Sequence, residues 1–188
     1  SAQKHRSRTF KEVVSEYRAW GEAQGGWRGH PWSEGHLTRR RSNLNWWKDR
    51  LGLATLADLV GVLPRIEKAL RDLESKGLAG KTLRHYAEGI SAFCDWCVDR
   101  GYLADDPLRA PAPFDTTPQT RRRVMNPDEI RGLLSASPPD RHLLYKTALF
   151  SGLRAKELRN LTVDHLDVER CGLHLDAEWT KNRQPGFQ

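Results

Sequence analysis

The sequence lacks long apolar runs, and among its 188 residues it has only three cysteines and one methionine. No stretch approaches the roughly 18 consecutive apolar residues of a membrane span, and the N-terminus has no apolar signal-peptide core. We therefore expect no membrane partner and a cytoplasmic location. Hydrophobic residues make up 38% and charged residues 29%, which is ordinary for a water-soluble protein of one medium domain or two small ones.

Two of the three cysteines form a C-x-x-C spacing, Cys94 and Cys97. This spacing can belong to a zinc site or a redox motif. A structural zinc site needs four ligands, however, and a thioredoxin-like motif needs a preceding strand, which the sequence does not predict here. We therefore expect buried helix thiols and no metal. A phosphate-loop-like phrase at residues 77–82 has its first glycine two residues too close, so we expect no nucleotide cofactor.

Positive charge is concentrated near the N-terminus of the chain. The formal net charge is +7, and residues 1–50 hold 11 Lys and Arg against 5 Asp and Glu, whereas residues 51–110 hold 8 against 9. A concentrated positive field favours a polyanion, because each neutralised phosphate releases condensed counterions. Nucleic acid is the leading partner on this ground, but a basic surface kept for solubility explains the charge equally well.

Apolar spacing predicts that the first hundred residues are helical. Spacings of three and four indicate helices at residues 9–22, 33–50 and 81–100, with a short and a longer helix between residues 52 and 77. Thr9 and Ser33 can cap the first two helices. The proline-rich segment 105–118 cannot continue a helix, so it marks a domain boundary. The three arginines at residues 121–123 then lie along a phosphate backbone or form a solvated linker end.

Two helices carry polar and basic residues opposite their apolar stripes. Arg39 and Asn43 lie on that face of the second helix. Lys81, Arg84 and His85 lie in the first turns of the helix at residues 81–100, where the helix macrodipole disfavours cations. This unfavourable order points to a DNA-contacting end, although a solvated face with accidental order would look the same.

Beyond the boundary the sequence predicts both helices and strands. Residues 126–129 (Asn-Pro-Asp-Glu) combine a cap, a proline at the first helical position and acids at the positive end of the dipole. That helix reaches about Ser135, and two further helical stretches follow at residues 142–150 and 155–161. Residues 162–188 alternate more like strands.

The segment Ser151-Gly152-Leu153-Arg154-Ala155-Lys156-Glu157-Leu158 closely resembles the first arginine box of the tyrosine recombinases, or phage integrases. Upstream, residues 81–108 are similar to the last helix and exit of that family's core-binding domain. Residues 179–185 look like the family's β-hairpin, whose turn bears a catalytic lysine, here Lys181. The resemblance covers nearly the whole chain.

This resemblance implies a fold and a domain organisation. It implies a mainly α chain, in which a four-or-five-helix, SAM-like core-binding domain occupies residues 1–108. Residues 109–123 would be a linker. Residues 124–188 would be the truncated beginning of a mixed α/β catalytic domain with a small antiparallel sheet.

The resemblance also implies a chemistry and roles for three residues. In this family a tyrosine attacks a phosphodiester and forms a 3′-phosphotyrosyl intermediate, without a metal or nucleotide. Arg154 would neutralise the non-bridging phosphate oxygens, Glu157 would support that arginine, and Lys181 would protonate the departing 5′-oxygen. An ordinary surface arginine and an ordinary turn lysine are the alternatives.

Other parts of the family's active site are not found. The last tyrosine is Tyr145, and no His-x-x-Arg box follows Arg154, so we expect this fragment not to cleave DNA.

The expected function is the DNA-binding part of a site-specific recombinase or integrase; the alternative is a non-catalytic DNA-binding regulator. Expected partners are double-stranded DNA and further recombinase protomers, in a tetrameric synapse for the parent enzyme, with a nucleoid-associated location. The expected DNA-binding residues are Arg39, Arg40, Asn43, Lys81, Thr82, Arg84 and His85 in the major groove and Arg121, Arg122 and Arg123 on the backbone.

Overall fold

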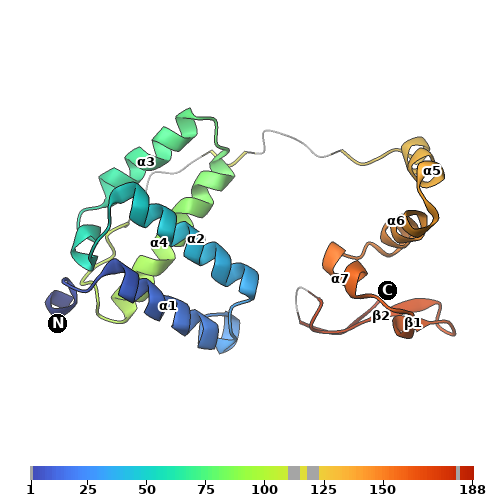
Figure 1. Cartoon of the computed structure of the whole chain (residues 1–188), viewed down its shortest axis with the longest axis horizontal. Helices are drawn as coiled ribbons and strands as arrows, with labels where there is room; N and C mark the ends of the chain where they lie inside the picture. The colour runs from blue at the N-terminus through green and yellow to red at the C-terminus, as the bar shows by residue number, and fades with distance from the viewer. Residues whose placement is uncertain (1, 110–114, 118–122, 181–182) are drawn as a thin grey trace. The chain divides into compact units, whose positions relative to one another are not determined.

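The computed structural model describes residues 2–109, 115–117, 123–180 and 183–188 and is mainly helical, with a small three-stranded antiparallel sheet (Figure 1). This confirms the predicted fold class. The chain divides into two compact units, residues 1–121 (unit 1) and 122–188 (unit 2). In the part of the chain that is described, no helix is both long and apolar enough to cross a membrane. The α-helices are α1 (Phe10–Gln24), α2 (Glu34–Leu51), α3 (Leu63–Ser75), α4 (Gly80–Asp99), α5 (Pro127–Ala136), α6 (Pro139–Ser151) and α7 (Ala155–Asn160).

In unit 1, local capping sets where the helices begin and end. Thr9 begins α1 with a capping box, in which its Oγ1 accepts from Glu12 N at 3.2 Å and its own N–H donates to Glu12 Oε2 at 3.1 Å. Ser33 caps α2, and Gly52 ends that helix in the left-handed conformation. The predicted caps at Thr9 and Ser33 are thus confirmed.

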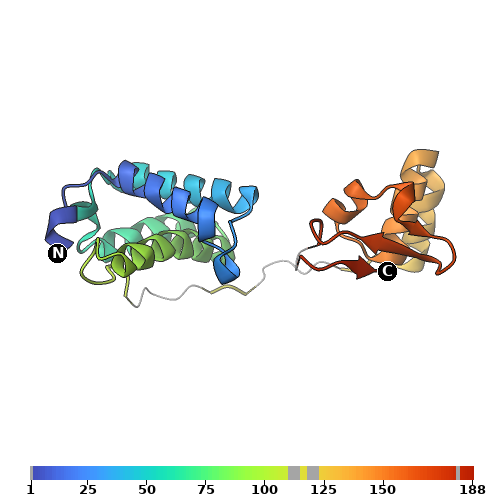
Figure 2. The same cartoon turned by 90° about the horizontal axis from the view of Figure 1, so that it is seen from below.

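The core of unit 1 lies between α1 and α2 on one side and α3 and α4 on the other (Figure 2). The largest side chains, Trp47, Tyr17, Phe10 and Phe93, are essentially inaccessible to solvent. Short 3-10 turns complete the unit: η1 (Ala2–His5), η2 (Trp27–Gly29) and η3 (Leu56–Leu59). Cys94 and Cys97 are buried and unpaired on α4, and burial raises the pKa of both thiols.

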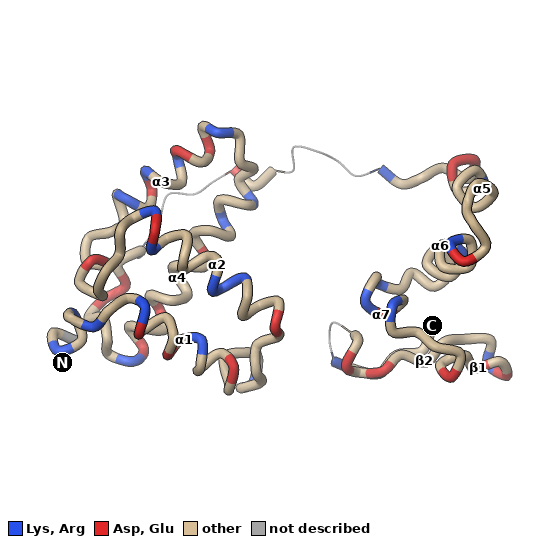
Figure 3. The backbone as a smooth tube through the Cα atoms, in the orientation of Figure 1, with Lys and Arg blue, Asp and Glu red and all other residues tan. Residues whose placement is uncertain are grey.

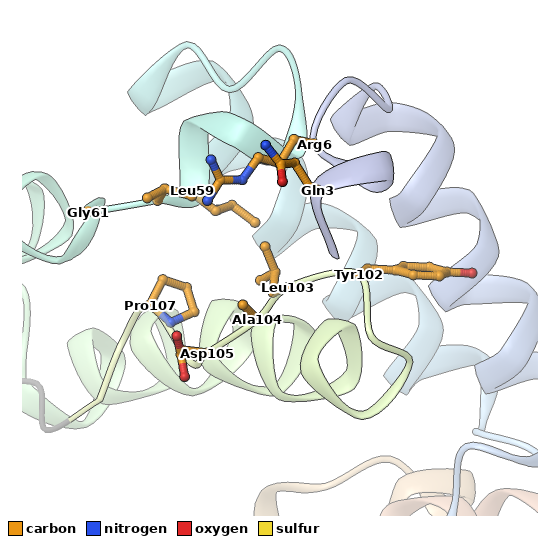
Figure 4. Close-up of a pocket in the computed structure, with 10 residues that line it drawn as sticks. Gln3, Arg6, Leu59, Gly61, Tyr102, Leu103, Ala104, Asp105 and Pro107 are labelled. Atoms are coloured by element: carbon orange, nitrogen blue, oxygen red, sulfur yellow. The ribbon is translucent and has the colours of Figure 1, made fainter. Parts of the chain in front are cut away.

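A polar clamp holds the N-terminal segment of unit 1 against α1 and the exit from α4. Arg8 forms a bidentate ion pair with Glu16, and Tyr102 Oη donates to Glu16 Oε2 at 3.0 Å. The hydrogen bond from Arg8 lowers the pKa of Glu16. Beside this clamp is a hollow of about 650 Å³ with Arg6 and Leu59 on one wall and Leu103 and Pro107 on the other (Figure 4).

Unit 2 consists of α5, α6, α7, a 3-10 turn η4 (Val163–His165) and the sheet of β1 (Leu166–Asp167), β2 (Gly172–Leu175) and β3 (Gly186–Phe187). Leu166 pairs with Leu173 across β1 and β2, and His174 pairs with Phe187 across β2 and β3. Helix α6 begins at Pro139, three residues before the apolar stretch predicted at residue 142, because Pro139 fits the first turn of a helix.

The apolar side chains of unit 2 are mostly accessible to solvent. Leu153 and Leu175 are its only buried apolar side chains among those described. Exposed large apolar residues include Val124, Leu143, Phe150, Val163 and Val168. The extended hydrophobic core of the described chain therefore lies in unit 1.

Candidate nucleic-acid interface

A groove follows the line where α2 and α4 meet. Its volume is about 650 Å³, and its walls are polar, basic and aromatic. Lys and Arg, blue in Figure 3, occur along α2 and at the beginning of α4. Five of the predicted DNA-binding residues line this groove: Arg39, Arg40, Asn43, Thr82 and His85. The remaining groove residues are His36, Ser42, Trp46, Tyr86, Glu88 and Gly89.

Arg40 and Asn43 join the two helices as well as lining the groove. Arg40 donates to the carbonyls of Glu88 at 3.2 Å and Gly89 at 3.4 Å. Asn43 Nδ2 donates to the carbonyls of His85 and Tyr86, both at 3.3 Å. These contacts leave much of the donor capacity of both side chains occupied within the protein. Sequence reasoning predicted both as DNA-contacting residues and missed this structural role.

Gly89 permits this close approach of the two helices. A Cβ added to Gly89 would lie 2.1 Å from Asn43 Oδ1. That oxygen is buried and has no hydrogen-bond partner among the described residues. A glycine at this point of α4 is therefore required by the packing of α2.

The remaining predicted cations differ in how they are paired. Arg39 and Lys81 are exposed, and neither forms an ion pair with any residue in the described ranges. Arg84 Nε donates to Glu88 Oε1 at 2.7 Å and His85 lies 3.3 Å from Glu88 Oε2, contacts that lower the pKa of Glu88. Pairs this exposed contribute little to stability, so an incoming anion can replace Glu88 at small cost.

His36 lies at the α1-facing end of the groove. Its Nε2 accepts from Arg40 Nε at 3.1 Å, and its ring centroid lies 4.9 Å from that of Trp32. Burial lowers the pKa of His36, and the nearby positive charges of Arg40 and Arg39 lower it further. The neutral ring is thus the form that holds Arg40 in place.

In unit 2, Arg154 and Glu157 form a local pair at the start of α7. Gly152 ends α6 with φ +64°, and Arg154 then takes the extended N-cap position of α7. Glu157 Oε2 accepts from Arg154 N at 2.7 Å, and Glu157 Oε1 accepts from Arg154 Nη1 at 2.9 Å. The Glu157 side chain is 4% exposed and the Arg154 side chain 65% exposed. These hydrogen bonds lower the pKa of Glu157 and aim a partly accessible guanidinium outward.

Lys181 lies outside the described residues, but the segment before it is well anchored. Thr180 Oγ1 donates to Gln184 O at 2.7 Å and accepts from Gln184 N at 3.1 Å. Lys156 Nζ donates to Glu178 O at 3.0 Å. Lys156 stands between Arg154 and Glu157 in the sequence, so it ties the arginine box to the segment leading to Lys181. Sequence reasoning did not identify this role.

Comparisons with known proteins agree on one family. No family model matches the chain. Tyrosine recombinase XerC of Neisseria gonorrhoeae (strain ATCC 700825 / FA 1090) is 29% identical over 126 residues, which are 62% of this chain and 40% of that protein. Tyrosine recombinase XerC of Mycobacterium sp. (strain KMS) is 27% identical over 134 residues, 66% of this chain and 45% of that protein. The chain thus spans less than half the length of these relatives.

Solved structures show the same fold. A lambda integrase dimer bound to a COC' core site matches with a TM-score of 0.76 at 16% identity, covering 99% of this chain and 50% of that one. The Tn1549 transposon integrase in complex with transposon right end DNA matches with a TM-score of 0.65 at 18% identity, covering 89% and 52%. Together with the arginine box, these comparisons show that the chain is similar in sequence to tyrosine recombinases and in fold to integrases.

Of the arginine cluster at residues 121–123, Arg121 and Arg122 lie outside the described residues. Arg123 is described and forms a bidentate ion pair with Glu129, at 2.7 and 2.6 Å. Glu129 also completes the capping box of Asn126 at the start of α5. Arg123 is therefore held at the beginning of α5, a position that the charge run alone did not indicate. In the described part of the chain, no group of three or more His, Cys, Asp or Glu could hold a metal ion.

Proposed function

We propose that this chain is part of a tyrosine recombinase and binds duplex DNA through the groove face of α2 and α4. The observation that carries the proposal is the convergence of Arg39, Arg40, Asn43, Thr82 and His85 on one groove. A duplex major groove is about 12 Å wide and admits an α-helix, and free cations at Arg39 and Lys81 are available for its phosphates. Two solved integrases with the same fold are bound to DNA, which supports the same partner for this chain.

The proposal assigns parts of the chain as follows. Residues 1–108 form the core-binding domain, residues 109–123 the linker, and residues 124–188 the N-terminal part of a catalytic domain. The exposed apolar side chains of unit 2 support the last assignment, because surfaces of this kind mark contacts with further protein. In the whole protein, recombinase protomers would assemble on the DNA, as in the lambda integrase tetramer bound to a Holliday junction.

Arg154 would contribute to catalysis in the whole protein. An exposed guanidinium fixed by the buried carboxylate of Glu157 can meet two non-bridging phosphate oxygens with its planar fork. Lys181 would act as general acid at the departing oxygen. Since Tyr145 is the last tyrosine and precedes the box on α6, we propose that these 188 residues hold DNA without cutting it.

Fluorescence anisotropy with a labelled duplex tests the DNA-binding proposal. Wild type should bind with an affinity that falls steeply between 50 and 200 mM salt. Replacing Arg39 and Arg84 together by alanine should weaken binding and reduce the slope of log affinity against log salt by about two. Replacing Lys68 and Arg71 of α3 by alanine removes the same charge away from the groove and is the matched control. Equal affinities for all three proteins at every salt concentration would overturn the proposal.

A further inference from the structure

The turn between α1 and α2 projects an aromatic and a basic side chain into solvent. Trp27 is 82% exposed, and the guanidinium carbon of Arg28 lies 5.9 Å from the centre of its ring. Neither side chain belongs to the hydrophobic core. A large exposed aromatic beside a cation is therefore a feature that the fold of unit 1 does not explain.

The turn is a fixed projection and not a loose loop. Gly26 N donates to His30 O at 2.7 Å, and His30 N donates to Trp27 O at 3.2 Å. At its base, Trp32 N donates to Gly21 O at 2.9 Å and Trp32 Nε1 donates to Gly25 O at 2.5 Å. Hydrogen bonds at the base of the turn and across the turn therefore fix the position of its tip.

Arg28 adopts a backbone conformation that disfavours any side chain. Its φ of +54° and ψ of +31° lie in the left-handed region, which glycine enters without strain. The strain of an exposed arginine at this position points to a role for its charge outside the fold.

The turn stands at one end of the α2–α4 groove. Trp32, which anchors the turn, has its ring centroid 4.9 Å from that of His36, and the Arg40 guanidinium lies 5.9 Å from the Trp32 ring. Residues 25–42 contain four arginines and one acidic residue, Glu34. The turn and the groove therefore share one basic surface.

We propose that this turn is a second contact with duplex DNA, in which Arg28 binds a backbone phosphate and Trp27 packs on the adjoining deoxyribose. This inference rests on the proposed binding of DNA by the groove. With a rise of about 1.5 Å per residue, the start of α2 lies about 7.5 Å along the helix from Arg39. A major groove is about 12 Å wide, so Arg39 within it would bring the turn to its edge, where the phosphates run.

Two variants separate the ionic from the apolar part of this contact. Arg28→Gly removes the cation and relieves the left-handed strain, so its melting temperature should equal or exceed that of wild type while its duplex affinity falls. Its salt slope should decrease by about one. Trp27→Ala should lower affinity by about threefold or more with an unchanged salt slope, because indole packing displaces no counterions. Hydroxyl-radical footprinting should show a shorter protected backbone for both variants.

Val60→Ala is the matched control for Trp27→Ala, since Val60 is also an exposed apolar residue (57%) of unit 1 and does not line the groove. Wild-type affinity and footprint in both turn variants, with binding still lost on replacing Arg39 and Arg84, would overturn this inference and leave the groove proposal standing. If wild type does not bind the duplex, both fail. A third outcome is that a single Trp27→Ala chain binds a short duplex with wild-type affinity, but fewer chains assemble together on longer DNA. The turn would then be a protein–protein contact, and the inference would be wrong.

Discussion

At the scale of single residues, burial and pairing decide which side chains can react or titrate. The chain has three cysteines with the same thiol group but different surroundings. Cys94 and Cys97 are buried in the core of unit 1, whereas Cys171 is exposed in unit 2. His36 is neutral by preference because it is partly buried between arginines. Both differences lead to measurable predictions.

The three thiols should separate by reactivity. Burial raises the pKa of Cys97 to about 12 and raises that of Cys94 well above its usual value, so neither forms a thiolate readily at pH 8. With a thiol-specific aromatic disulfide reagent, one fast-reacting thiol per chain is expected, and the other two should react at least about 100-fold more slowly. Cys171→Ser should remove the fast phase. Two or three fast thiols in the folded protein would contradict the burial of Cys94 and Cys97.

Unit 1 should lose stability in mildly acidic solution through His36. Because the pKa of His36 is lowered in the folded state, the unfolded chain takes up this proton first as pH falls below about 6.5. The stability contributed by the neutral ring is therefore present above that pH and is lost as pH falls through the lower, folded-state pKa. Thermal unfolding between pH 8 and 5 should show this loss, and His36→Gln should reduce it. An identical pH profile for the variant would contradict the prediction.

At the scale of elements, the contact of α2 with α4 is the feature that shapes the candidate DNA-binding surface. Three side chains of α2, Arg40, Asn43 and Trp47, donate to backbone carbonyls of α4. Such bonds require the helices to approach closely, and Gly89 provides the space. The separation of these two helices therefore determines the width of the groove.

Replacing two glycines of unit 1 by alanine should change the free energy of unfolding in opposite directions. Gly89→Ala would place a Cβ 2.1 Å from Asn43 Oδ1, so it should destabilise unit 1 by about 1–3 kcal/mol. Gly35, on α2, has nothing within 4 Å of an added Cβ, so Gly35→Ala should stabilise by about 0.5–1 kcal/mol through helix propensity. Urea unfolding of both variants measures the difference. Equal destabilisation of both variants would show that the contact of α4 with Asn43 of α2 does not cause the loss of stability in Gly89→Ala.

At the scale of the whole molecule, the two units differ in how much apolar surface they bury. Unit 1 encloses a continuous core, whereas unit 2 leaves Leu143, Phe150 and Val163 largely exposed. Local stability follows buried apolar contact, so the units should open independently and to different extents. This contrast bears on the proposed function, since the proposed active-site arginine, Arg154, belongs to the less enclosed unit.

Hydrogen exchange on the whole chain tests this contrast. Amides in α4 around Phe93 should be the slowest to exchange, and amides of α5 and α6 should exchange at least about 100-fold faster. Phe150→Ser, at an exposed position, should leave the protection of unit 1 unchanged. Comparable protection in both units would mean that unit 2 buries more apolar surface than this structure contains.

Local features of the fold could be predicted from the sequence. The capping boxes of Thr9 and Asn126 involve residues three apart, and the helical stripes repeat every three or four residues, so neighbours in the chain are enough to specify them. The same holds for the arginine box, because Arg154 and Glu157 are paired within a single turn of helix.

Other features depended on which distant segments come together. The sequence predicted Arg40 and Asn43 only as DNA-contacting residues, and the packing of α2 on α4 showed that they bind helix carbonyls more than 40 residues away. The anchoring of Lys156 to Glu178 and the exposure of the apolar residues of unit 2 were likewise invisible in local patterns. The sequence by itself determined the helices, their caps and the arginine box, because these are interactions within a few residues. The tertiary structure decided which polar groups remain free to bind a partner, since that depends on what each helix packs against.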